Sequence, residues 1–233
     1  MVTGADMPDT NAAGTGPLML HIDGSRALSG ETVAAVAAAC GRAEDAAGAA
    51  VVVVRVTGAP HGQWAASLTT KLVNQWEQAL RRLERLPATT IAAAEGDCGG
   101  PALDALLATD HRIAARTTRL VLPTQAGLVW PGMALYRLAR QAPNSTAVRQ
   151  AALYGAAIGI EDALALHLVH EVTDDVDAAV ATATARAAEV SGTELAVRRQ
   201  LALDAQTVGF EEALGTHLAA VDRTLRLAAG AAS

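Results

Sequence analysis

A run of valines near residue 50 constrains the fold more than any other part of the sequence. From Ala50 to Val56 the chain reads AVVVVRV, in which Arg55 is the single polar residue. A strand with one solvent-exposed face alternates apolar and polar side chains, whereas a strand buried on both faces does not. The run therefore predicts a strand buried on both faces, as in a parallel sheet covered by helices.

Strand and helix patterns alternate around this strand. The expected order is strand 18–22, a helix capped by Ser29, strand 50–56, helix 67–85, strand 89–94, a glycine-rich turn at 95–101, helix 102–108, and strands 110–114 and 119–122. Beyond Pro131 the pattern is mainly helical. This alternation predicts a single α/β domain with crossover connections.

The chain divides into three regions: a disordered leader (1–16), a core (17–172) and a C-terminal helical extension (173–233). The leader is small and polar and shows no periodicity. In the extension, an apolar stripe recurs at helical spacing: Leu214, Leu218, Val221 and Leu225. The stripe belongs either to an intramolecular core or to a contact between subunits, and the latter would make the extension an oligomerisation region.

Charge and aromatic content argue against nucleic-acid binding. The net charge is -6, Lys71 is the single lysine, and the arginines are scattered along the chain. Nucleic-acid binders concentrate positive charge on one face and stack bases on aromatic rings, which make up only 3% of this chain. We therefore expect no nucleic-acid partner.

Compartment and metal binding follow from two further features. No apolar run approaches the roughly 20 residues needed to span a bilayer, and the first residues lack the positive charge of a secretory signal. The two cysteines, Cys40 and Cys98, have no Cys/His cluster around them, so no metal site is expected. We expect a cytoplasmic protein with reduced cysteines, although the sequence leaves a disulfide open.

Four segments, in order, resemble the crotonase (enoyl-CoA hydratase/isomerase) superfamily. They are Arg26–Ser29 (RALS), Val51–Gly58 (VVVVRVTG), Thr90–Ala114 (TIAAAEGDCGGPALDALLATDHRIA) and Leu153–Val172 (LYGAAIGIEDALALHLVHEV). In the last segment His167 stands where the family usually has glycine. The resemblance covers about residues 18–230.

This resemblance implies a crotonase-like spiral of ββα units with a helical C-terminal region that assembles trimers or hexamers. It also implies an acyl-CoA thioester as ligand, so that coenzyme A is part of the substrate and no separate cofactor is needed. In this family two backbone N–H groups stabilise the thioester enolate. Preorganised donors of this kind contribute roughly 3 kcal/mol each to lowering a barrier.

The first of these donors departs from the family pattern. The family's Phe-x-Ala-Gly-x-Asp stretch matches Trp64 to Thr69, so the donor N–H falls on Leu68 and Ser67 replaces glycine. The family's aspartate is missing, and the lid that follows is short. The resemblance makes Trp64, Ala66 and Ser67 substrate-binding residues.

The second donor also departs from the pattern. Counting back from Asp110 places it on Pro101, which has no N–H. Either the donor moves to Gly100, with Gly99 supplying flexible backbone, or this half of the oxyanion hole is absent. Gly99 and Pro101 are then expected to contact the substrate.

One of the two carboxylates of a hydratase survives. The first glutamate matches Asp104 and the second matches Thr124, which does not titrate near neutral pH. Asp104 is the expected acid/base, although it also suits the first turn of a helix. Thr124 either orients a substrate hydroxyl or serves as a loop or capping residue.

A degenerate site with a short lid is most similar to the DpgB-type crotonases of the 3,5-dihydroxyphenylglycine pathway. That similarity implies dehydration and aromatisation of a polyketide-derived CoA thioester toward 3,5-dihydroxyphenylacetyl-CoA, together with a type III polyketide synthase, in antibiotic precursor biosynthesis. The alternative is a non-catalytic binding subunit of the synthase. A thioesterase or isomerase on the same fold is a third hypothesis.

Overall fold

The computed structural model describes residues 16–46, 50–188 and 192–231, so the expected leader lies outside the described residues except for Gly16. Its strands are β1 (Leu18–Asp23), β2 (Val51–Gly58), β3 (Thr89–Gly99), β4 (His111–Ala115), β5 (Arg119–Val121), β6 (Thr124–Gln125), β7 (Leu128–Val129), β8 (Ile158–Gly159) and β9 (Glu171–Thr173). Its helices are α1 (Gly30–Asp45), α2 (Thr70–Glu84), α3 (Pro101–Leu107), α4 (Met133–Gln141), α5 (Thr146–Tyr154), α6 (Ile160–Ala165), α7 (Val176–Ala188), α8 (Thr193–Asp204) and α9 (Phe210–Ala231).

The main sheet is parallel along its principal path. Within the described residues seven strands join it, in the order β1-β2-β3-β4-β9, with β5 paired to β3 and β8 paired to β5. Each pair along the path is parallel, β5 is parallel to β3, and the β5–β8 pair is antiparallel. A small hairpin, β6–β7, lies outside this sheet. The predicted parallel sheet is therefore confirmed.

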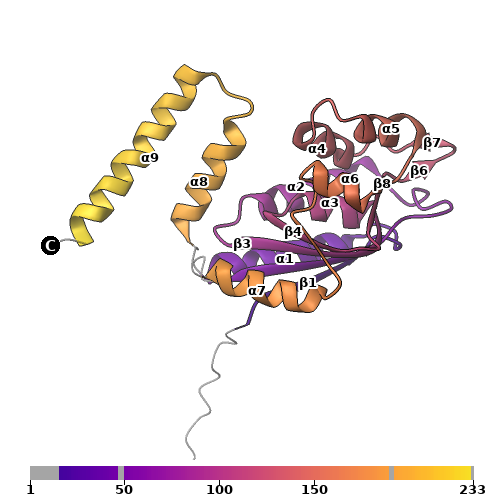
Figure 1. Ribbon diagram of the computed structural model, residues 1–233, viewed down its shortest axis with the longest axis horizontal. Helices are drawn as coiled ribbons and strands as arrows, with labels where there is room; N and C mark the ends of the chain where they lie inside the picture. Colours follow the sequence, from indigo (N-terminus) through magenta and orange to yellow (C-terminus); the bar gives the residue numbers. More distant parts are fainter. Residues whose placement is uncertain (1–15, 47–49, 189–191, 232–233) are drawn as a thin grey trace, which may run out of the picture.

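The valine run of β2 is buried on both faces, as predicted. Val52 and Val54 pack into a core shared with α1, α2 and α3, whereas Val51 and Val53 face the other side of the sheet. Helix α7 covers that second side through Val176, Ala179 and Val180. Figure 1 shows helices on both faces of the sheet.

Helix α7 packs differently from the two helices that follow it. The sequence placed residues 173–233 together in an extension, yet α7 packs on the sheet and forms a second cluster of buried side chains. The mainly helical pattern beyond Pro131 did not show that one of its helices covers a face of the sheet. In the described chain, α8 and α9 are the helices that stand apart from the sheet (Figure 1).

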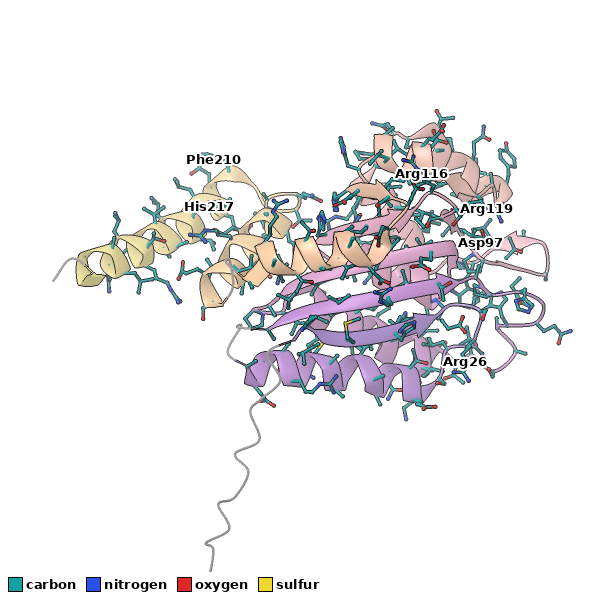
Figure 2. All side chains as sticks on the ribbon, turned by 60° about the horizontal axis from the view of Figure 1, so that its bottom comes forward. Arg26, Asp97, Arg116, Arg119, Phe210 and His217 are labelled. Carbon is teal, nitrogen blue, oxygen red and sulfur yellow. The ribbon has the colours of Figure 1, made fainter. Side chains whose placement is uncertain are left out.

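Strand β3 is longer than predicted. Residues 95–99 were expected in a turn, but the strand continues to Gly99 because its last three residues pair with β5. A register shift between Thr57 and Gly58 accommodates the two extra residues, with Gly96 at φ +66°. Asp97 accordingly projects from a strand, and its carboxylate accepts two 2.7 Å hydrogen bonds from Arg119 (Figure 2).

Helix termini explain two other boundaries. The Ser29 hydroxyl accepts a 3.2 Å hydrogen bond from the Thr32 N–H, so the predicted cap of α1 is confirmed. Helix α2 begins at Thr70 rather than at residue 67, because Thr69 caps it by accepting a 3.1 Å bond from Leu72 N–H. The residues before Thr69 are then free to form the loop that reaches the candidate site.

Helix α9 leaves its apolar stripe exposed. The exposed fractions are 39% for Leu214, 58% for Leu218, 52% for Val221 and 64% for Leu225. The stripe therefore does not belong to an intramolecular core. Among the described helices, none combines the length and apolar composition needed to cross a bilayer.

Cys40 and Cys98 are both buried and free, so they form no disulfide with each other. Burial raises the pKa of the Cys40 thiol to about 11 and raises that of Cys98 still further. Both side chains therefore act as small apolar core residues.

Candidate active site

Three backbone segments contact one another directly at the carboxyl ends of β1, β2 and β3. A Cβ atom added to Gly24 would lie 2.3 Å from the carbonyl oxygen of Gly99 and 2.4 Å from that of Gly58. After this contact the chain turns at Gly100, with φ +52°, and Pro101 begins α3. The close approach of these backbone segments, which glycine allows because it has no side chain, thus fixes where α3 starts.

A small cavity lies beside the start of α3. Its volume is about 30 Å³, and its wall contains all three residues predicted to be catalytic: Leu68, Gly100 and Asp104. Trp64 and Pro101 also line it. The remaining lining residues are Leu28, Val73, Trp76, Glu77, Trp130, Gly132 and Met133. A volume near that of one water molecule can hold a small reacting group but not a whole acyl chain.

Four predicted substrate-binding residues lie outside this wall. Ala66, Ser67 and Thr124 line no part of it, and Gly99 is buried next to Gly100. Thr124 is exposed and takes part through its backbone, because its carbonyl oxygen accepts a 2.9 Å hydrogen bond from Trp64 Nε1. The Trp64 ring also meets Trp130 edge-on, with 5.1 Å between ring centroids. Trp64 therefore holds the donor loop against the β6–β7 hairpin.

The first predicted donor is already occupied. The Leu68 N–H donates to the Ala65 carbonyl over 3.0 Å, within a short turn of the donor loop. The second predicted donor, Gly100, is buried in the cavity wall, where a Cβ would lie 2.5 Å from Pro60 Cγ, so a residue with a side chain would not fit there. Binding of a thioester oxygen by Leu68 therefore requires its N–H to leave Ala65.

Asp104 is largely buried, with 15% of its side chain exposed. Its Oδ2 accepts a 3.1 Å hydrogen bond from Trp76 Nε1, whereas its Oδ1 is buried without a hydrogen-bond partner. Burial, reinforced by the negative charge of Glu77, raises the pKa of Asp104 from 3.8 to about 7, although Arg137, Trp76 and the backbone N–H of Ala134 oppose the rise. Asp104 can therefore both hold and release a proton near neutral pH.

Sequence reasoning missed two charged neighbours of Asp104. Arg137 of α4, of which 8% is exposed, places its Nη1 atom 2.9 Å from Glu77 Oε2 of α2 and 4.0 Å from Asp104 Oδ1. The Arg137 Nε atom donates to Glu84 over 2.8 Å. Burial raises the pKa of Glu77. On a helix of mixed polarity these glutamates look like surface residues, and only the contact with α4 reveals them.

A larger cavity adjoins the small one. Its volume is about 550 Å³, and Glu77 and Met133 line both. It lies between α2, α4 and α8, with a lining that includes the polar side chains of Arg81, Tyr136, Arg140, Gln141, Arg199 and Gln206. Pockets that bind small molecules typically enclose ~300–1,000 Å³. The sequence analysis placed no site residue in this cavity.

Comparisons with known proteins identify the family of the chain. A profile of the enoyl-CoA hydratase/isomerase family matches residues 30–224. A relative from Amycolatopsis orientalis, named Enoyl-CoA-hydratase, is 49% identical over 211 residues, which cover 91% of this chain and 97% of that protein.

Solved structures show the same fold at low sequence identity. An enoyl-CoA hydratase/isomerase from Marinobacter aquaeolei has a TM-score of 0.74 at 18% identity, covering 89% of this chain and 88% of that one. An enoyl-CoA hydratase from Mycobacterium smegmatis has a TM-score of 0.75 at 18% identity, covering 89% and 87%. The predicted α/β crotonase fold is thus confirmed, and the chain belongs to the enoyl-CoA hydratase/isomerase family.

Proposed function

We propose that the protein is an acyl-CoA-thioester lyase of the hydratase/dehydratase type. The observation that carries this proposal is Asp104, a largely buried carboxyl with a pKa of about 7, whose Oδ1 atom accepts no hydrogen bond and lies 4.0 Å from the Arg137 guanidinium. It lines one cavity with both expected oxyanion donors, Leu68 and Gly100. A general acid or base works best when its pKa lies near the operating pH. The name of the Amycolatopsis relative supports the same reaction class.

The proposed reaction is loss of water from a β-hydroxyacyl thioester. The bond between the α-carbon and its hydrogen breaks, the double bond forms, and the β-hydroxyl leaves as water. The thioester oxygen becomes negative during this step and is bound by the N–H groups of Leu68 and Gly100, the former after leaving Ala65. Asp104 moves the proton.

The proposed substrate is a polyketide-derived CoA thioester, as in the DpgB-type crotonases, with 3,5-dihydroxyphenylacetyl-CoA as the aromatic product. The large cavity supports an oxygen-rich acyl group, because its arginine, glutamine and tyrosine side chains would lose hydrogen bonds against a hydrocarbon chain. Loss of water that creates an aromatic ring is thermodynamically favourable, so an incomplete oxyanion hole can suffice for this reaction.

The proposed partners follow from the same role. A type III polyketide synthase would supply the thioester, and the subunit would assemble as a homotrimer or hexamer. The exposed apolar stripe of α9 supports assembly, because a stripe of this size is unfavourable in water.

One observation favours a second candidate, a non-catalytic binding subunit of the synthase. Leu68 N–H is bonded to Ala65, and Pro101 has no N–H, so neither position that matches the family's donor motifs offers a free N–H. A subunit of this kind would hold the thioester without turning it over.

Single-turnover assays separate the two candidates. Wild type and Asp104→Ala are mixed with a panel of 3-hydroxyacyl-CoA and enoyl-CoA thioesters, and water loss or addition is followed by ultraviolet absorbance and mass spectrometry. We expect Asp104→Ala to slow turnover by at least about 100-fold. Unchanged turnover would remove the role of Asp104, and binding without turnover by the wild type would support the binding subunit.

A further inference from the structure

A second carboxylate faces the same small cavity as Asp104. Glu77, from α2, lines this cavity together with Asp104, Leu68 and Gly100, and its side chain is only 19% exposed. The cavity also contains a buried acceptor without a hydrogen-bond partner, Asp104 Oδ1. An unsatisfied buried oxygen beside an empty volume is an arrangement that a substrate hydroxyl can complete.

The two carboxyl groups have different electrostatic surroundings. Arg137 Nη1 lies 2.9 Å from Glu77 Oε2 but 4.0 Å from Asp104 Oδ1. The nearer guanidinium opposes the rise that burial gives to the pKa of Glu77, and the negative charge of Glu77 in turn favours the protonated form of Asp104. Two titratable groups that differ in this way are suited to opposite roles as base and acid.

We infer that Glu77 is the catalytic base of this site and that Asp104 is the acid. This inference rests on the proposed lyase function. The Glu77 carboxylate takes the proton from the carbon next to the thioester carbonyl, and the electron pair of that bond forms the double bond. The bond between the β-carbon and oxygen breaks, and the Asp104 proton goes to the departing hydroxyl, which leaves as water. Glu77 ends protonated and Asp104 ionised, so the charge balances.

Glu77 thus supplies the carboxylate that Thr124 cannot. Thr124 is exposed and outside the cavity wall, so the position that matches the family's second acid does not reach the reacting groups. The replacement comes from a different helix, and counting along the family motif could not find it.

Glu84 provides a matched control on the same helix. Its carboxylate also accepts from Arg137, over 2.8 Å, and its side chain is 16% exposed. However, Glu84 does not line the small cavity. Glu84 does line the large cavity, but glutamine there keeps an acceptor of nearly the same size, so Glu84→Gln disturbs the same arginine without removing a carboxylate from the small cavity.

The experiment separates proton removal from water loss. Phenylacetyl-CoA has no β-hydroxyl, so exchange of its α-protons in D2O, followed by NMR, measures the base alone. Single-turnover dehydration of a panel of 3-hydroxyacyl-CoA thioesters measures base and acid together. Both assays use the full-length protein as wild type, Glu77→Gln, Asp104→Asn and Glu84→Gln.

We expect Glu77→Gln to slow both exchange and dehydration by at least about 100-fold. Asp104→Asn should slow dehydration to a similar degree and leave exchange close to the wild-type rate, whereas Glu84→Gln should retain both. If Glu77→Gln fails to fold, Glu77→Asp keeps the charge near Arg137 and withdraws the base by one methylene, so it should still slow exchange by at least about tenfold.

These assays distinguish failure of the role of Glu77 from failure of the proposed lyase function. If the wild type dehydrates a thioester and the Glu77 variants exchange and dehydrate at the wild-type rate, the role of Glu77 is wrong and the lyase stands. If the wild type neither exchanges nor dehydrates any thioester, the lyase function and the role of Glu77 are both wrong.

Discussion

At the scale of single residues, Asp104, which the proposed chemistry requires, is also a side chain that destabilises the folded protein at high pH. Asp104 is largely buried, and its pKa of about 7 means that the folded protein resists its ionisation. Active-site residues commonly carry such a cost, because the environment that tunes their pKa is not the one that maximises stability.

Replacement of Asp104 by asparagine should remove this cost. Because the folded pKa of about 7 exceeds the ordinary 3.8, folded wild type binds more protons than the unfolded chain between these values. The stabilising effect of the proton is complete below the ordinary pKa and is lost as pH rises through about 7. At ~1.4 kcal/mol per pKa unit, the loss approaches about 4 kcal/mol at its upper limit.

The asparagine side chain keeps an oxygen for Trp76 Nε1 without titrating, so we expect Asp104→Asn to match wild type near pH 4 and to be more stable at pH 9. Urea unfolding across that pH range measures the difference. An equal dependence of stability on pH in the two proteins would show that Asp104 is not the group responsible.

At the scale of elements, Arg137 joins α2 to α4. Its guanidinium is buried between Glu77 and Glu84 of α2, and it is also 4.0 Å from Asp104 of α3. Three helices thus meet around one cation. Removing that cation takes the guanidinium from the largely buried Glu77 carboxylate and leaves Glu84 with its 3.2 Å contact to Arg81.

Arg137→Leu should therefore destabilise the protein in a pH-dependent way. Loss of the cation raises the folded pKa of Glu77 further, so the loss of stability increases as pH rises. Removal of one member of a buried ion pair typically costs about 3–5 kcal/mol, which we expect near pH 8. Near pH 5, where the raised pKa of Glu77 allows protonation, the loss should be smaller. Thermal unfolding at both values measures it, and equal losses would point to packing rather than charge.

Most elements could be predicted because their signals are local. The β2 valines, the Ser29 cap and Pro101 at the first turn of α3 each act through neighbouring residues. The extension of β3 could not be predicted, because Gly96 and Asp97 are typical turn residues and only pairing with β5 keeps them in a strand. The hairpin of β6 and β7 likewise makes its contact with Trp64, which lies 60 residues before Thr124 in the sequence.

In the candidate site, too, local signals could be predicted and contacts between distant segments could not. Family spacing located Leu68 and Asp104 and placed the second donor on Pro101, one residue after the alternative donor Gly100, and these residues do line one cavity. Motif spacing does not give the direction of a side chain. Thr124 was predicted to bind substrate, but its side chain is exposed, and it is the backbone carbonyl that makes a contact, with Trp64. Glu77 and Arg137 are far apart in the sequence and meet only through the packing of α2 on α4.

At the scale of the whole molecule, the chain has a compact sheet-and-helix core and a protruding helical hairpin. Figure 2 places Phe210 and His217 on this hairpin, at the opposite end of the molecule from Arg26, Asp97 and Arg119. Arg199 fixes α8 to the core through Asp110, whereas α9 contacts α8 and presents its apolar stripe outward. The core therefore does not use the stripe for its own folding.

A charge placed in the stripe should consequently dissociate subunits without unfolding them. Leu218→Arg puts a cation at the centre of the stripe, where each leucine buried in an interface contributes about 1.5–3 kcal/mol. Thr216→Arg adds the same charge on the opposite face of α9. We expect light scattering after size exclusion to show a trimer or hexamer for wild type and Thr216→Arg and a monomer for Leu218→Arg.

Circular dichroism should show the same helix and strand content in all three proteins, because residue 218 lies outside both buried clusters of the core. A monomeric wild type, or a Leu218→Arg protein of unchanged mass, would contradict assembly through α9. The stripe would then need another occupant, and the synthase proposed as partner would be the first to test, by measuring whether Leu218→Arg abolishes its binding while Thr216→Arg retains it.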